Sequence, residues 1–294
     1  MIVVRLKGGL GNQLFQYAVG FALAKAWNVP LRCEASHYVH HHVRRVELEA
    51  LISEVPWITP MERLRQRAFT EAGVGGFLSR FQRRLLSPRW QPYRREDPHT
   101  TPLSLLEDPR RALHLDGYWH EDRIFLPVAQ ELRATLKPNS ALQARLDRGL
   151  ALVAGCDVAI HVRRGDYATN PDVKAEFGLL EEDYYRRAIA LLRARAPVQR
   201  IAVFSDDLDH ILRSWNLQAD LIAPGKGLED SSAGDLWLMS RAPALVTANS
   251  SLSWWAAWLG ERPGRPVVTP RPWFRNEILH RPPHLLDDWI RLDV

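Results

Sequence analysis

Cysteine is scarce in this chain, since Cys33 and Cys156 are its 2 copies in 294 residues. So few cysteines cannot form a disulfide framework, and their spacing fits no zinc site. Long apolar runs are lacking as well, because none reaches the ~18 residues that a membrane span needs. A signal peptide is not indicated, because residues 1–6 read as an immediate first strand with no basic segment before it. We therefore expect a cytoplasmic protein, or one that is peripheral on the inner face of the membrane.

Acidic residues are outnumbered, 34 against 39 lysines and arginines, which gives a formal net charge of +5. The excess is local: from Arg63 to Arg95 there are nine arginines and one acid, Glu71. Apolar residues at helical spacing between Phe77 and Leu85 predict an amphipathic helix that packs on its own core. The alternative is a patch that contacts anionic lipid headgroups or an acidic acceptor. Nucleic acid is not expected as a partner, because no binding motif accompanies the charge.

Four histidines lie close together after the second expected strand, namely His37, His40, His41 and His42. Such a cluster invites interpretation as a metal site, but no acidic or cysteine co-ligand pattern lies nearby. We therefore expect a solvated loop there and no metal site in the chain.

A glycine-rich turn with Gly8, Gly9 and Gly11 follows the first strand and opens a helix expected over residues 12–27. A dinucleotide fingerprint would need a third glycine at Leu14, and the Gly-Lys-Ser/Thr of a Walker loop is absent. The turn still brings backbone N–H groups and the Asn12 side chain to the carboxyl edge of a strand. That placement suits a site that faces a second domain across a cleft.

Strands and helices alternate regularly in the second half of the chain. Strands are expected at residues 157–162, 201–204, 221–222, 244–247 and 267–268, with helices between them. Alternation of this kind predicts an α/β protein whose parallel sheet is covered on both faces. We expect an N-terminal domain of residues 1–150 and a C-terminal domain of residues 151–294, whose last helix packs back on the first domain.

Three polar clusters each follow an apolar strand in this half: His161 to Asp166, Ser205 to Asp207, and Asn249 to Ser251. Because the carboxyl ends of parallel strands share one edge, the clusters are expected to converge on one crevice. Arg163 and Arg164 suit a phosphate-rich ligand, because guanidinium forks match phosphate oxygens. The alternative is that both arginines are surface ion-pair partners of Asp166.

The other two clusters each allow a binding role and a structural one. Asn249, Ser250 and Ser251 open a helix, so they either hold phosphate oxygens or serve as a helix cap. Asp206 or Asp207 can accept hydrogen bonds from the N–H edge of a guanine, or can cap the helix that follows. The residues alone leave both alternatives open.

Several longer segments carry a family pattern: GGLGNQLFQYA from Gly8 to Ala18, IHVRRGDY from Ile160 to Tyr167, VFSDD from Val203 to Asp207, LMS from Leu238 to Ser240, ANSSLSWWAAWL from Ala248 to Leu259, and PRPWF from Pro270 to Phe274. In this order and over this span the chain resembles the bacterial α-1,2-fucosyltransferases of glycosyltransferase family 11. The resemblance implies a GT-B-like fold of two Rossmann-type domains with a cleft between them. It implies an acceptor-side N-terminal domain and a C-terminal domain that binds GDP-fucose.

The resemblance also implies a reaction. It is an inverting transfer of L-fucose from GDP-fucose to the 2-hydroxyl of a terminal β-galactoside of a glycan, such as an O-antigen, with no cofactor and no required metal. Arg163 would hold the donor diphosphate, and Asn12 would lie close to the transferred sugar. The other expected donor-binding residues are His161, Arg164, Asp206, Asp207, Asn249, Ser250, Ser251 and Gly11.

The base that takes the acceptor proton is not evident from the sequence. Asp116, Glu121 and Asp166 are candidates, and Asp166 could instead orient Arg163 or Arg164.

Two departures from the family pattern bear on the site. Related sequences often carry Cys and His where this chain has Ala242 and Ala244, a change that leaves the donor site intact. They also continue Gly-Tyr-Trp with Gln-Ser-Glu, where this chain has His120, Glu121 and Asp122, so the acceptor side differs. Three alternatives to the expected activity stay open: a non-catalytic nucleotide-sugar or glycan-binding protein, a fucosyltransferase of different linkage, and a transferase of another nucleotide sugar.

Overall fold

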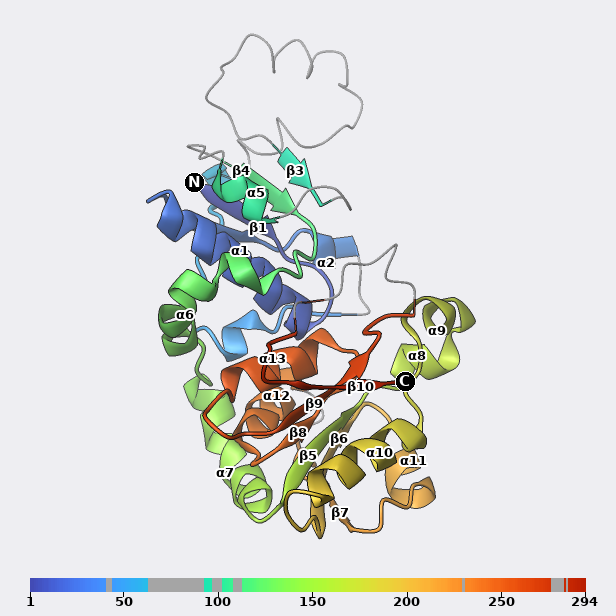
Figure 1. Ribbon diagram of the computed structural model, residues 1–294. Coiled ribbons are helices and arrows are strands. Elements are labelled where there is room, and N and C mark those ends of the chain that lie inside the picture. Colours follow the sequence, from blue (N-terminus) through green and yellow to red (C-terminus); the bar gives the residue numbers. More distant parts are fainter. Residues whose placement is uncertain are drawn as a thin grey trace. The chain divides into compact units, whose positions relative to one another are not determined.

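The structure is a computed structural model that describes residues 1–40, 44–62, 93–96, 102–107, 113–228, 231–275, 283 and 285–294. The chain divides into two compact units, Met1–Glu49 with Glu54–Ala134, and Ala50–Ser53 with Thr135–Val294 (Figure 1). The division after Ala134 is earlier than the expected boundary at residue 150. It falls there because helix α7 (Ser140–Ala154) packs on helix α12 (Ser232–Arg241) of the second unit.

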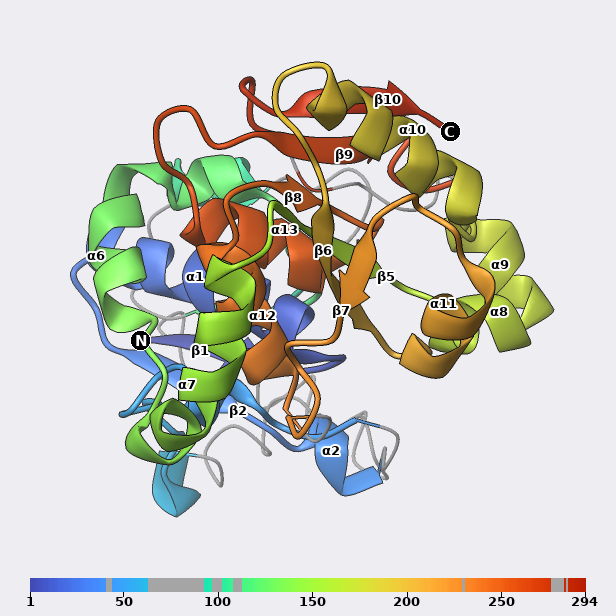
Figure 2. The same ribbon diagram turned by 90° about the horizontal axis from the view of Figure 1, so that it is seen from below.

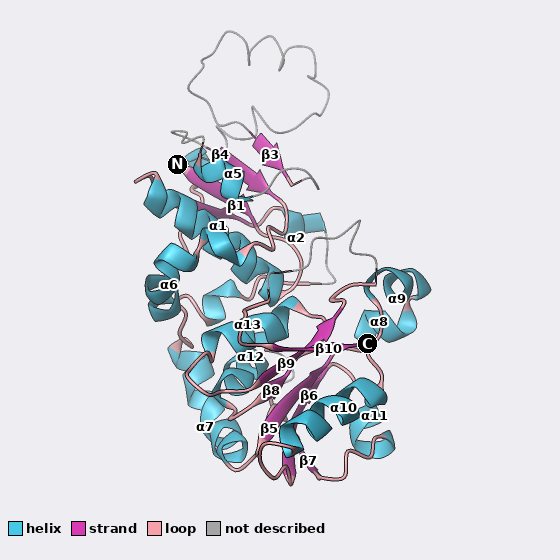
Figure 3. Cartoon of the chain, in the orientation of Figure 1, coloured by secondary structure: helices cyan, strands magenta, loops and turns pink. Residues whose placement is uncertain are grey.

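The first unit is built on a parallel four-stranded sheet in the order β2-β1-β4-β3. Figure 3 draws the strands in magenta. Its strands are β1 (Ile2–Arg5), β2 (Leu31–Glu34), β3 (Tyr93–Arg95) and β4 (Leu113–Asp116). In the register of the sheet, Ile2 lies opposite Leu31 and Leu113. The other described elements of the unit are α1 (Leu10–Ala26), α2 (His37–His40), η1 (Leu48–Ala50), α5 (Pro102–Leu106), η2 (Asp122–Ile124), η3 (Leu126–Val128) and α6 (Ala129–Thr135).

Helix α1 lies directly against β1, and a glycine permits this close approach. A Cβ atom on Gly20 would be 2.5 Å from the side chain of Val4. Both Ile2 and Val4 are completely buried. The tight packing fixes α1, whose first turn contains Asn12, at the carboxyl edge of the sheet.

The second unit contains a parallel six-stranded sheet in the order β10-β9-β8-β5-β6-β7. The strands are β5 (Val158–Val162), β6 (Arg200–Ser205), β7 (Asp220–Ile222), β8 (Leu245–Val246), β9 (Val267–Arg271) and β10 (Ile290–Asp293). The remaining helices are α8 (Gly165–Thr169), α9 (Pro171–Phe177), α10 (Glu182–Arg193), α11 (Leu208–Ser214) and α13 (Ser251–Leu259). Helices α10 and α11 lie on one side of this sheet and α7, α12 and α13 on the other (Figure 2). The predicted parallel sheet, covered on both faces, is confirmed.

The expected last helix is not among the described residues that follow β9. The last described element is strand β10, which pairs in parallel with β9. Residues 276–282 and 284 lie outside the described ranges. The expected packing of a final helix on the first domain therefore stays a prediction.

The arginine-rich segment lies mostly outside the described residues. Of the stretch from Arg63 to Arg95, the structure describes Tyr93–Arg95, which form β3. Of the histidine cluster, it describes His37–His40, and His41 and His42 lie outside. The predicted lipid contact therefore stays a prediction. No helix in the described ranges is long and apolar enough to cross a membrane.

A short segment from the first half of the chain belongs to the second unit. The carbonyl of Ala50 accepts a hydrogen bond from the N–H of Asn139 (2.9 Å), and that of Leu51 accepts one from Lys137 (2.8 Å). Leu51 and Ile52 are buried. Residues 50–53 are thus attached by backbone hydrogen bonds to Lys137 and Asn139, which directly precede α7.

The carboxyl ends of α12 and α13 converge on Arg265. Its guanidinium donates to the carbonyls of Met239 (2.8 Å), Ala242 (3.0 Å) and Ala257 (3.2 Å). These are carbonyls of the kind that a helix leaves unpaired at its end. Burial is the main cause that lowers the pKa of Arg265, to about 9, so its guanidinium still carries its charge at neutral pH.

Candidate active site

The two arginines after β5 form ion pairs with four carboxylates, those of Asp166, Asp206, Asp207 and Glu181. Arg163 donates through Nη1 to Asp206 Oδ2 (2.5 Å) and through Nη2 to Asp166 Oδ1. Arg164 donates through Nε to Asp207 Oδ2 (3.2 Å). The structure thus brings together five of the predicted site residues. The ion pair of Arg163 with Asp166 is consistent with two of the earlier alternatives. One is that Arg163 is an ion-pair partner of Asp166, and the other is that Asp166 orients the arginine.

Asp206 closes the turn between β5 and α8. Its Oδ1 accepts hydrogen bonds from the backbone N–H groups of Arg164 (2.8 Å) and Gly165 (3.1 Å). A Cβ atom on Gly165 would be 2.5 Å from Asp206 Oδ2, so only glycine leaves room for this carboxylate. Asp206 therefore fixes the backbone of the segment that contains both arginines. Its expected contact with guanine stays a prediction.

His161 lies in β5 with its side chain buried. Val158, Ile160 and Val162 belong to one apolar cluster, so His161 faces the opposite side of the sheet. Burial is the main cause that lowers its pKa to about 4, although Asp206 acts in the opposite direction. The imidazole is therefore neutral at pH 7. Within the described part of the chain, Nδ1 has no hydrogen-bond partner, which is uncommon for a buried polar atom.

The third predicted cluster has structural contacts of its own. Asn249 donates through Nδ2 to the carbonyls of Phe177 (2.8 Å) and Gly178 (3.1 Å), which ties the end of α9 to the start of α13. Ser250 is the N-cap of α13, and its Oγ accepts a hydrogen bond from the N–H of Leu252 (3.3 Å). The capping alternative is thus observed for Ser250. Binding of phosphate at this helix start stays a prediction, as does a role for Ser251, the first residue of α13.

In the first unit, the turn before α1 is held by Gln13, which is fully buried. Its Nε2 donates to the carbonyls of Gly8 (3.1 Å) and Arg45 (2.8 Å) and to Tyr38 Oη (2.9 Å). Its Oε1 accepts from the N–H of Glu47 (2.9 Å). Gln13 therefore stabilises the turn by linking it to residues 45 and 47. Gly8 has φ +74°, in the left-handed region that favours glycine.

Asn12 lies beside His120, which is not among the site residues predicted from the sequence. Its Oδ1 lies 3.0 Å from Nε2 of His120. Gly11 is buried in the first turn of α1. In the sequence, the departure of His120 from the family pattern is the feature that could have indicated its place beside Asn12.

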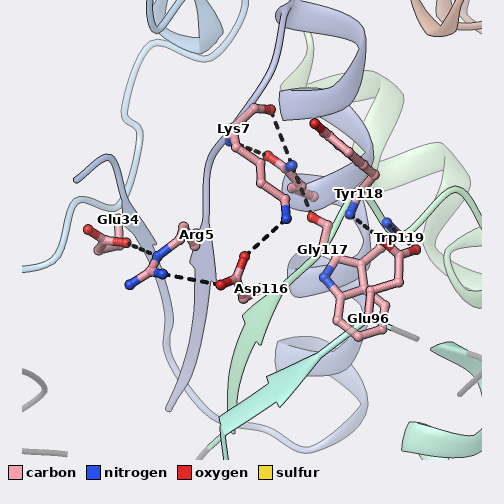
Figure 4. Close-up of polar contacts among 9 residues, drawn as sticks. Arg5, Lys7, Glu34, Glu96, Asp116, Gly117, Tyr118 and Trp119 are labelled. Carbon is pink, nitrogen blue, oxygen red and sulfur yellow. Dashed lines mark hydrogen bonds and ion pairs between the residues drawn. The ribbon is translucent and has the colours of Figure 1, made fainter. Parts of the chain in front are cut away.

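Four charged residues form a chain across the carboxyl edge of the first sheet (Figure 4). Arg5 bridges Glu34 (3.0 Å) and Asp116 (3.1 Å), and Asp116 also accepts from Lys7 Nζ (3.1 Å). Lys7 Nζ lies 4.9 Å from the ring centroid of Tyr118. Arg5, Lys7 and Glu34 were not predicted from the sequence, although each lies at or just after the end of a buried strand.

All three candidate bases are held by cations. Asp116 accepts from Arg5 and Lys7, and Asp166 pairs with Arg163. Glu121 is buried and accepts from Arg123 Nε (2.7 Å) and Nη2 (2.9 Å). Both carboxylate oxygens of Asp116 and of Glu121 are thus engaged, whereas the ion pair of Asp166 with Arg163 involves Oδ1. In the described ranges, no group of three or more His, Cys, Asp or Glu residues is placed to hold a metal ion.

The family model of glycosyl transferase family 11 matches residues 96–292. This chain belongs to glycosyl transferase family 11. The family 11 chain is 29% identical over 298 residues to the alpha-1,2-colitosyltransferase of Escherichia coli. The alignment covers 100% of this chain and 99% of that protein. It is 28% identical over 312 residues to the O-antigen biosynthesis glycosyltransferase WbnK of Escherichia coli, covering 98% and 99%. It is 26% identical over 264 residues to the galactoside 2-alpha-L-fucosyltransferase Sec1 of Mus musculus, covering 88% and 64%.

Solved structures share the fold of this family 11 glycosyltransferase. A variant of Arabidopsis thaliana FUT1 in complex with GDP matches with a TM-score of 0.55, 12% identity, and coverage of 95% of this chain and 72% of that one. POFUT1 in complex with GDP matches with a TM-score of 0.54, 15% identity, and coverage of 91% and 97%. At these identities the likeness is evidence of the fold alone. The expected α/β fold of GT-B-like type is confirmed, and the family establishes the chain as a transferase.

Proposed function

We propose that this glycosyltransferase transfers L-fucose from GDP-fucose, with inversion, to the 2-hydroxyl of a terminal β-galactoside of a glycan, and that it needs no metal. The observation that carries the proposal is the pair of arginines at the carboxyl end of β5, where Arg163 forms ion pairs with Asp166 and Asp206. Such an edge of a parallel sheet is where nucleotide ligands bind. The relative named for 2-alpha-L-fucosyl transfer supports the sugar. The relative named for alpha-1,2-colitosyl transfer supports the linkage.

The chemistry requires stabilisation of the leaving group. The bond from the anomeric carbon to the phosphate oxygen breaks, and GDP departs with additional negative charge. Cationic and N–H donors that are already in place stabilise this charge without reorganisation. Arg163 carries five N–H donors, and its two carboxylate partners fix the plane of the guanidinium. The N–H groups at the start of α13, behind Ser250, form a second candidate contact for phosphate.

The proposal is tested by incubating the protein with GDP-fucose and lactose, with and without EDTA. Release of GDP that depends on lactose, and that survives EDTA, supports the enzyme and its independence from metal. The linkage follows from the NMR spectrum of the product. Binding of GDP-fucose without acceptor-dependent release would instead support a nucleotide-sugar-binding protein, and a product linked elsewhere than at the 2-hydroxyl would contradict the proposed linkage.

The colitosyltransferase relative makes GDP-colitose a second candidate donor. Colitose differs from fucose in lacking the 3-hydroxyl. A site that hydrogen-bonds a hydroxyl rejects the analogue without it by a factor of about 10⁴, whereas a site without such a bond discriminates weakly. Parallel measurements of kcat/KM with both donors therefore distinguish the two activities. A preference for GDP-colitose would overturn the proposed donor while leaving the enzyme class unchanged.

A further inference from the structure

The turn that follows β4 has an unusual backbone and is held from two sides. Trp119 has φ +55°, a left-handed conformation that bulky residues rarely adopt. The carboxylate of Glu96 accepts hydrogen bonds from the N–H groups of Tyr118 (2.5 Å) and Trp119 (2.9 Å), as Figure 4 shows. Gln16 donates to the carbonyl of Gly117 (3.0 Å) from the opposite side. A backbone that is so firmly held sets the position of the next residue, His120.

Gly117 is required for this arrangement. A Cβ atom at this position would be 2.3 Å from Cβ of Glu96 and 2.9 Å from the Trp119 ring. The indole of Trp119 is completely buried, which anchors the turn in the unit. The path of the chain from β4 to His120 is therefore determined by packing as well as by hydrogen bonds.

The imidazole of His120 is itself packed between two aromatic rings. The ring of Phe15 meets it edge-on with a centroid distance of 4.9 Å. The ring of Tyr118 stacks with it at 5.8 Å and an interplanar angle of 21°. These contacts restrict rotation of the imidazole, so that Nε2 stays 3.0 Å from Asn12 Oδ1.

The hydrogen bond between the two residues determines how the carboxamide of Asn12 is oriented. An amide oxygen can only accept, so Nε2 of His120 carries the proton. With Oδ1 on His120, the Nδ2 group of Asn12 lies over Gly8, where a Cβ atom would be 2.6 Å from it. The positive φ of Gly8 and the absence of a side chain there leave room for this amide group.

We propose that His120 is a positioning residue, which holds the carboxamide of Asn12 in the orientation in which it acts on the sugar substrate. The kinetic part of this inference rests on the proposed function. The hydrogen bond itself is a property of the free protein and can be tested without any substrate.

The first experiment measures the order of the Asn12 side-chain amide by ¹⁵N relaxation, with its resonance assigned through Asn12→Ala. We expect an order parameter near 0.85 in the unmodified protein, which is typical of rigid groups, and below about 0.6 in His120→Leu. His120→Gln should restore the order, because the Gln amide nitrogen reaches about as far as Nε2. His120→Asn is the matched control, with the same amide on a side chain that is one carbon shorter, and should stay mobile.

The second experiment compares steady-state kinetics of the same variants with GDP-fucose and lactose. We expect His120→Leu and His120→Asn to lower kcat by about 100-fold, the scale of a misplaced reacting group. The KM for GDP-fucose should change less than about 3-fold, and His120→Gln should keep kcat within about 3-fold. In a double-mutant cycle, His120→Leu should add little to Asn12→Ala, because both remove one shared interaction.

Each outcome bears on a separate statement. An ordered Asn12 amide in His120→Leu would overturn the positioning role, whatever the kinetics. If His120→Gln orders the amide but is as slow as His120→Leu, the imidazole itself acts in the reaction and the positioning role is overturned. If the unmodified protein transfers no sugar while the amide orders as expected, the proposed function fails and the positioning hydrogen bond stands.

Discussion

Burial of a neutral histidine in the second sheet should make the protein sensitive to acid. The pKa of His161 lies at about 4 in the folded chain against an ordinary value of 6.5, chiefly because burial disfavours the charged ring. The unfolded chain therefore takes up a proton below pH 6.5, whereas the folded chain resists protonation until about pH 4. Stability is lost as the pH falls through this window, and it is fully present above pH 6.5.

The magnitude follows from the shift. A difference of 2.5 units (6.5 minus 4) corresponds at most to about 3 kcal/mol, and about 2 kcal/mol is lost by pH 5 relative to pH 8. Native-state hydrogen exchange of the β5 amides at pH 8 and pH 5 measures this loss after correction for the intrinsic rates. His161→Gln, which does not titrate, should remove about 2 kcal/mol of the pH dependence.

His114 provides a matched comparison in the other sheet. Its pKa is also lowered to about 4, first by burial and then by Arg5. His114→Gln should therefore reduce the acid sensitivity of the β4 amides and leave that of β5 in place. If β5 has the same pH dependence with histidine or glutamine at position 161, the assignment of a buried neutral imidazole is refuted.

Three further predictions concern single side chains. Arg163→Ala should lower kcat by at least ~100-fold if the proposed donor to the leaving phosphate is lost. Acceptor-dependent GDP release measures this change, with Arg186→Ala, at an exposed side chain, as the control. Arg265→Met should lower the free energy of unfolding by about 3 kcal/mol in urea denaturation, because three helix-end carbonyls lose a charged donor; Arg213→Met, at a side chain that is 80% exposed, should change it by less than about 0.5 kcal/mol. Gln13→Leu should also cost about 3 kcal/mol through its lost hydrogen bonds, with the exposed Gln143→Leu as control.

The controls decide how these results are interpreted. Near-normal kcat in folded Arg163→Ala would remove this arginine from the proposed leaving-group contact. Equal effects of Arg265→Met and Arg213→Met would show that the helix-end contacts contribute nothing particular. A Gln13→Leu variant as stable as Gln143→Leu would show that the hydrogen bonds of Gln13 do not stabilise the turn before α1.

The sequence was sufficient to predict the parallel architecture and the strand-end location of the polar clusters. Apolar strands that end in polar residues identify the carboxyl edge of a parallel sheet, and Arg163, Arg164 and Asp206 lie there as predicted. The sequence could not predict which carboxylate pairs with which arginine, because the pairing depends on the neighbouring positions of β5 and β6. Asp206 was expected to bind guanine or cap a helix, and its hydrogen bonds to the Arg164–Gly165 backbone come from this pairing.

The same limitation explains the residues that were missed in the first unit. Arg5, Glu34 and Asp116 are far apart in the sequence, and only the strand order β2-β1-β4 makes them neighbours. His120 was visible as a departure from a pattern, but its partner Asn12 lies on another element. Long-range contacts of this kind depend on the order of strands, which periodicity does not reveal.

The segment at residues 50–53 has a consequence for exchanging parts between relatives. It precedes the division after Ala134 in the sequence, yet its carbonyls accept the N–H groups of Lys137 and Asn139. A chimera joined at residue 134 would pair one parent's Ala50 and Leu51 with the other parent's chain before α7. Recombination of the two units between relatives is therefore better done with residues 50–53 taken from the parent that supplies the second unit.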